Sequence, residues 1–159
     1  MKKYAKTACD YLLIGLLLIA CTAAEYSVIT PFVYLRISAV ICICLCLAKP
    51  GIASVATGAV CGFLADIYSF NLPVFSLLYL YISSGCVWSV GQFVSLNKKT
   101  VFMICFLALL GFFAGEFMLN LLIYESSGGI EYLFMCIAFA LINASPSPVI
   151  YGILKRVQF

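Results

Sequence analysis

The sequence contains no histidine and few charged residues, and each shortage excludes a class of protein. Without histidine the chain lacks the commonest general base and metal ligand, which excludes Ser-His-Asp and Cys-His catalysis. Charged residues make up 9% of the 159 residues, whereas soluble domains carry roughly 25%. Hydrophobic residues make up 65% of the chain. The composition therefore predicts an integral membrane protein, a single domain over residues 1–159 that contacts the lipid bilayer and binds no nucleic acid.

Cysteine is abundant, but its spacing does not indicate a metal site. Cys42, Cys44 and Cys46 alternate within one apolar run. Residues two apart point to nearly opposite sides of a helix, so these three thiols cannot close around one ion. The others are scattered singly: Cys9, Cys21, Cys61, Cys86, Cys105 and Cys136. We interpret all nine as small buried hydrophobic side chains and expect no metal or cofactor.

The apolar runs and the breaker residues between them predict an all-α fold with six transmembrane helices. Two prolines, Pro146 and Pro148, should break or kink the last of these helices. The predicted spans are 7–24, 31–48, 52–70, 73–94, 100–124 and 131–154.

The distribution of positive charge agrees with six spans and places both termini in the cytoplasm. With this orientation, the charged residues of the outer loops are all acidic: Glu25, Glu125 and Glu131. Arg36 is the one basic residue inside a span. The remaining basic residues all fall on the inner side, as the positive-inside rule requires: Lys2, Lys3, Lys6, Lys49, Lys98, Lys99, Lys155 and Arg156.

An alternative exists at the N-terminus. The basic start, the short apolar region and Leu18-Ile19-Ala20-Cys21 are typical of a signal peptide with an acylated cysteine. We prefer the interpretation that this segment is a first transmembrane helix, which pairs with the second span across a short turn. Processing at Cys21 would leave the orientation of the later spans unchanged.

The stretch 58–73 contains small residues followed by an acid within a span. Ser54, Gly58, Gly62 and Asp66 follow each other at intervals of four and share one helix face. Glycines four apart let another helix approach closely. The groove would receive either the first or second span of the same chain or the transmembrane helix of a partner. A similar pair, Gly111 and Gly115, lies in the fifth span.

Three ionisable side chains and one amide gather in the outer half of the predicted bundle. Arg36 and Asp66 lie about 7 Å and about 6 Å along their helices from the outer ends, so antiparallel packing of their spans predicts an ion pair. Glu116 lies about 12 Å below its outer end, with Asn120 one turn above it. This polar cluster is either a substrate or proton site or a structural clasp. Since no nucleophile or phosphate-binding loop accompanies the acids, we do not expect an enzyme.

Several motifs resemble those of MreD, the rod-shape-determining membrane protein family of bacteria. The resemblance rests on Tyr34-Leu35-Arg36 at the second span, on the G-x-x-x-G-x-x-x-D core from Gly58 to Asp66 and on the polar turn from Ser69 to Pro73. The acid Glu116 and the proline-containing basic tail 148–157 also fit.

This resemblance implies a non-catalytic scaffold in the bacterial cytoplasmic membrane. MreD-type proteins bind the single-span protein MreC and act with a RodA-type glycosyltransferase and a class B penicillin-binding transpeptidase in side-wall peptidoglycan synthesis. The bundle of such proteins is similar to the substrate-binding subunits of energy-coupling-factor transporters. The alternative function is therefore capture of a small molecule, such as a vitamin, for a transporter of that type.

Overall fold

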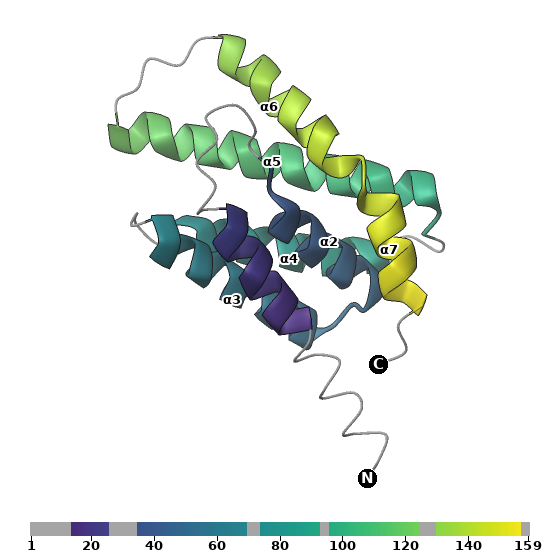
Figure 1. The fold of residues 1–159 in the computed structure, drawn as a ribbon. Helices are drawn as coiled ribbons and strands as arrows, with labels where there is room; N and C mark the ends of the chain where they lie inside the picture. The colour runs from purple at the N-terminus through teal and green to yellow at the C-terminus, as the bar shows by residue number, and fades with distance from the viewer. Residues whose placement is uncertain (1–13, 26–34, 70–73, 93–95, 125–129, 157–159) are drawn as a thin grey trace.

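The computed structural model describes residues 14–25, 35–69, 74–92, 96–124 and 130–156, and within these ranges it contains helices and no strand (Figure 1). Three helical stretches are long and apolar enough to cross a membrane, Val74–Gln92, Lys98–Leu119 and Glu131–Arg156. The helices are Ile14–Glu25, α2 Ile37–Ala48, α3 Ile52–Ser69, α4 Val74–Gln92, α5 Lys98–Tyr124, α6 Ile130–Ala144 and α7 Ser147–Arg156. The all-helical membrane character predicted from composition is thereby supported.

The centre of the molecule is α2. Every residue of this helix from Ser38 to Leu47 is buried, and α2 contacts α3, α4, α5, α6 and α7. Its sequence alternates cysteine with larger aliphatic residues, so all of its faces are apolar, as expected of a helix that is enclosed by others. The 12 residues of α2 span about 18 Å, less than the thickness of a bilayer core.

The predicted second span is therefore too long at its outer end. It was expected to run from residue 31, but residues 35 and 36 are not helical and α2 begins at Ile37. Residues 31–34 lie outside the described part of the chain. The first N–H groups of α2 have no partner within the helix, so they need partners elsewhere in the protein.

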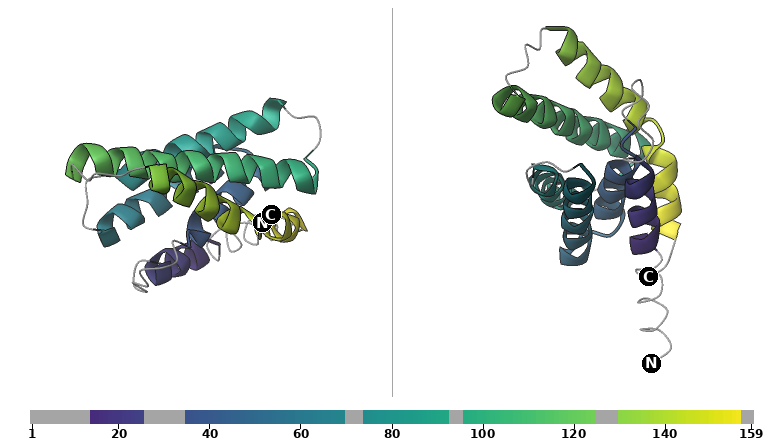
Figure 2. Two further views of the ribbon diagram at one scale, coloured as in Figure 1. Left: turned by 90° about the horizontal axis from the view of Figure 1, so that it is seen from above. Right: turned by 60° about the vertical axis from the view of Figure 1, so that its left-hand side comes forward.

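The last predicted span is broken, as its prolines indicate. α6 ends at Ala144 and α7 begins at Ser147, with Pro146 in the turn between them. The N–H groups of Val149 and Ile150 both bond to the carbonyl oxygen of Pro146, which restarts the helix. Figure 2 shows that α7 runs on in a different direction from α6, so it packs against α2 while α6 packs against α5.

The cysteine interpretation is confirmed where the structure describes the thiols. Cys42, Cys44, Cys46, Cys61, Cys86, Cys105 and Cys136 are buried free cysteines, and Cys21 is half-buried. Cys9 lies outside the described residues. The thiol of Cys44 donates to the carbonyl oxygen of Ser147 over 3.5 Å and so joins α2 to α7.

Candidate functional site

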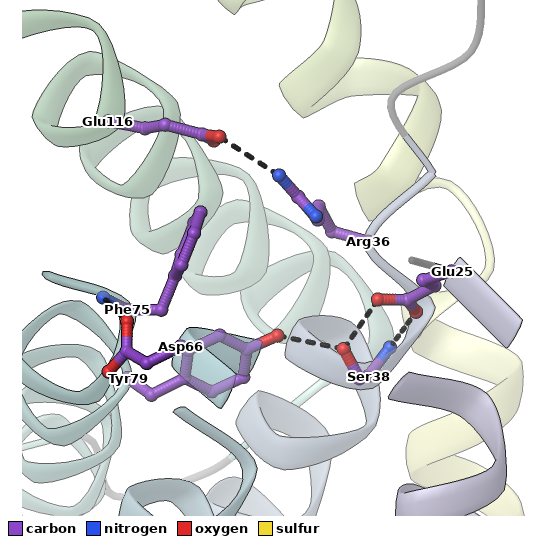
Figure 3. Close-up of polar contacts among 7 residues, drawn as sticks. All are labelled: Glu25, Arg36, Ser38, Asp66, Phe75, Tyr79 and Glu116. Atoms are coloured by element: carbon purple, nitrogen blue, oxygen red, sulfur yellow. Dashed lines mark hydrogen bonds and ion pairs between the residues drawn. The ribbon is translucent and has the colours of Figure 1, made fainter. Parts of the chain in front are cut away.

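Arg36 lies at the N-terminus of α2 and binds an acid on α5. Its Nη2 atom donates to Oε1 of Glu116 over 2.9 Å, and 9% and 17% of the two side chains are exposed. The guanidinium carbon also lies 5.3 Å from the centre of the Phe75 ring, within the range of a cation–π contact. The expected ion pair between Arg36 and Asp66 is therefore wrong: Arg36 pairs with Glu116, and Phe75 lies beside the guanidinium (Figure 3).

Asp66 instead caps the N-terminus of α4. Its Oδ1 atom accepts from the N–H of Phe75 over 2.8 Å, and Oδ2 accepts from the N–H of Ser76 over 2.9 Å and from the Ser76 hydroxyl. The first N–H groups of a helix have no partner within it, and the helix dipole favours a negative charge at this end. Asp66 therefore joins α3 to the start of α4.

A second carboxylate caps α2, and sequence reasoning missed it. Glu25 was placed in an outer loop, but it ends the helix Ile14–Glu25 and accepts from the N–H of Ser38 over 2.6 Å and from its hydroxyl over 2.7 Å. The Ser38 hydroxyl also bonds to the hydroxyl of Tyr79 over 2.7 Å (Figure 3). This chain of bonds links the first helix, α2 and α4.

The same helix end has another cap from α6. Oδ1 of Asn143 accepts from the backbone N–H of Arg36 over 2.7 Å, and its Nδ2 atom donates to the carbonyl oxygen of Phe139 over 2.9 Å. The sequence signal was present, since an asparagine near a proline break is a candidate helix-capping group. Only the fold brings Asn143 to a residue 107 positions away.

The glycine strip of α3 is filled by α4. A side chain at Gly58 would collide with Ser83, and a Cβ at Gly62 would lie 2.7 Å from both the carbonyl oxygen of Phe75 and Cα of Ser76. The strip is thus an internal contact, and the helix that fills it is neither the first nor the second predicted span. Ser54 is turned to its own loop, where its hydroxyl donates to the carbonyl oxygens of Lys49 and Gly51.

The two glycines of α5 have different surroundings. A Cβ at Gly115 would lie 2.8 Å from a methyl group of Leu78, whereas one at Gly111 would meet nothing within 4 Å. Gly111 lines an open groove of about 420 Å³ between α4 and α5, together with Gly85, Ser89 and Ala108. The open groove therefore lies at Gly111, whereas Gly58 is packed against α4.

Glu116 also borders a small pocket between α5 and α6. The pocket measures about 90 Å³, and its other walls are Phe113, Phe117, Tyr132, Met135, Cys136 and Phe139. Asn120 follows one turn later on α5, and its side chain lies outside the described part. The predicted polar cluster is therefore divided: Glu116 and Arg36 bind each other, and Asp66 caps the start of α4.

The acidic and thiol side chains of the described residues form no metal site. Among them, no group of three or more Cys, Asp or Glu side chains is arranged to hold a metal ion. Each of the three acids of the interior, Glu25, Asp66 and Glu116, accepts a hydrogen bond from the protein. Comparison of the chain with models of protein families, with curated proteins and with solved structures finds no match.

Proposed function

We propose that this chain is a non-catalytic scaffold of the bacterial cell-elongation complex, with the role that the MreD family has. It would span the cytoplasmic membrane six times with both termini inside. It would bind an MreC-like single-span protein and, through the complex, act with a RodA-type glycosyltransferase and a class B penicillin-binding transpeptidase. The resemblance of the sequence motifs is the basis of this assignment.

The proposal is supported by the role of the motif residues, which hold α3 and α4 together. Gly58 and Gly62 admit α4, and Asp66 caps it, so the G-x-x-x-G-x-x-x-D core builds the α3–α4 pair. These residues are engaged in holding the bundle together and are not aimed at a substrate. This favours a scaffold over the alternative, a vitamin-capture subunit of a transporter.

The size of the pocket at Glu116 supports the same choice. Its volume is about 90 Å³, whereas pockets that enclose drug-sized molecules measure roughly 300–1,000 Å³. A vitamin would require α5 and α6 to separate.

The topology is supported by the ends of the helices. Lys98 and Lys99 begin α5, and Lys155 and Arg156 end α7, which lie at the same side of the bundle in Figure 1. A reporter fused after Phe159 should therefore be active only in the cytoplasm. Activity of a periplasmic reporter at this position would contradict the six-span arrangement.

Within this proposal, the partner's helix docks in the groove between α4 and α5. Small residues at Gly85 and Gly111 let a backbone come close, and packing of this kind drives helix association in lipid. The strip at Gly58 is already filled by α4. We therefore expect the partner's transmembrane helix to bind in the groove between α4 and α5.

Affinity purification of the tagged chain in mild detergent tests the proposal. We expect an MreC-like protein and cell-wall synthases to co-purify, and Gly111→Leu to reduce their recovery without lowering the amount of the tagged chain. Gly152→Leu is the matched control, because Gly152 is also helical and also has open space around its Cα. Co-purification of paired ATPases would instead indicate a transporter, and equal recovery with both variants would exclude the groove.

A further inference from the structure

The pocket between α5 and α6 is lined by aromatic residues and by Glu116, a combination that the scaffold role does not require. It is lined by residues between positions 113 and 117 of α5 and between positions 132 and 139 of α6. The two helices diverge toward the end of α5 (Figures 1 and 2). Aromatic rings from both helices form its walls. Phe117 stacks on Tyr132 with ring centres 5.0 Å apart, and Phe113 lies 6.0 Å from Phe139. Four rings therefore surround a space that also contains the Glu116 carboxylate.

The carboxylate of Glu116 has capacity for a further donor. Arg36 binds one oxygen, Oε1, through a single nitrogen. Among the described residues, none donates to the second oxygen, Oε2. Because the side chain is 17% exposed and borders the pocket, this oxygen is accessible to a small ligand there.

The local charge favours a cation. Among the described residues, three carboxylates, those of Glu25, Asp66 and Glu116, and one guanidinium, that of Arg36, lie in this part of the bundle. The N-termini of α2 and α4, which bind two of these acids, each act as about half a positive charge, so roughly one negative charge remains. Glu131, exposed in the first turn of α6 next to Tyr132, adds to this negative potential.

We propose that this pocket binds the ammonium group of a small organic amine or of an amine-headed lipid. An ammonium group is attracted by aromatic rings and by a carboxylate, and residues of both kinds line the pocket. The volume of about 90 Å³ admits a charged head with a few carbon substituents. The inference depends on the pocket alone and is independent of the proposed scaffold role.

The test uses the full chain in nanodiscs of phosphatidylglycerol, a lipid without an amine. Radiolabelled choline is the probe, and choline and its uncharged isostere, dimethylbutanol, are the competitors. We expect saturable binding that choline displaces and dimethylbutanol does not. Equal displacement by the two competitors, or no saturable binding, would overturn the proposal.

Two variants locate the site. Tyr132→Leu removes a ring of the pocket but leaves the Arg36–Glu116 pair intact, and we expect it to weaken choline binding about tenfold. Phe134→Leu, on the same helix but 67% exposed and outside the pocket, should bind like the unaltered chain. Equal affinity of the two variants would exclude this pocket.

The lipid composition identifies the source of the amine. If an amine-headed lipid is the natural occupant, nanodiscs of phosphatidylethanolamine should bind less choline than nanodiscs of phosphatidylglycerol. If a free amine is the occupant, the two should bind equally. Both outcomes support an ammonium site and differ only in what fills it.

Discussion

Removing one charge of the Arg36–Glu116 pair should destabilise the protein more than removing both. The pair is nearly buried, so deleting either partner leaves a charge without its counter-ion in a medium of low dielectric. Such a deletion costs roughly 3–5 kcal/mol, whereas replacing both partners with apolar side chains is often close to neutral. The double variant Arg36→Leu with Glu116→Leu should therefore recover most of the stability that either single variant loses.

The two single variants should not be equal. After Arg36→Leu, the charge left without its counter-ion is that of Glu116, whose side chain is the more exposed of the two, at 17% against 9%. After Glu116→Leu, the guanidinium of Arg36 stays charged because it is not deprotonated in proteins. Its contact with Phe75 remains but offsets only about 0.5–2 kcal/mol. Glu116→Leu is therefore expected to be the more harmful change.

Reversible unfolding in mixed micelles of mild detergent and dodecyl sulfate measures these free energies. The double-mutant cycle should give a coupling energy of at least about 1 kcal/mol for Arg36 with Glu116, since contacting charged residues are not additive. A second cycle, of Arg36→Leu with Asp66→Leu, should show a smaller coupling because Asp66 binds the start of α4. Additive effects in the first cycle, or a larger coupling in the second, would refute the reasoning.

Further changes test the caps and the helix contact by the same unfolding assay. Asp66→Ala should cost about 2–4 kcal/mol because it leaves N–H groups of α4 unbonded, and Asp66→Asn should cost less because it keeps one acceptor; an unchanged stability of Asp66→Ala would show that the cap contributes nothing. Ser38→Ala removes the hydroxyl between Glu25 and Tyr79 and should cost about 1–2 kcal/mol, and an unchanged stability would contradict the role of this link. Gly58→Leu should abolish accumulation in the membrane because of its collision with α4, and survival of this variant at normal abundance would mean that α4 does not fill the strip.

The sequence predicted the helices better than their contacts. Apolar runs and breaker residues placed the fourth span at 73–94, and α4 occupies Val74–Gln92. The start of α2 was misplaced because hydropathy reports which residues tolerate an apolar environment and not where the backbone becomes helical. Here Leu35, which is exposed, and Arg36, which is buried, precede α2 without being helical.

The site was predicted in part, for a reason that geometry explains. Depth along a helix follows from residue number, so Arg36, Asp66 and Glu116 were predicted to lie at similar depths, and the structure brings Arg36 and Glu116 together. The direction of each side chain depends on how the helices are rotated and packed, which spacing does not give. Asp66 lies close in sequence to the start of α4 and bonds there, whereas Glu116 comes from 80 residues away.

The enclosure of α2 has a consequence for how the molecule is assembled. A span of about 18 Å has no position in a bilayer at which both of its ends reach water, so on its own α2 would be held there poorly. Its surroundings include α7, which is synthesised after the other described helices and which it joins through the Cys44 thiol and the carbonyl of Ser147. The environment of α2 is therefore complete only after a segment 103 residues further along the chain has been synthesised. Until then, residues of α2 that are buried in the complete bundle would face lipid.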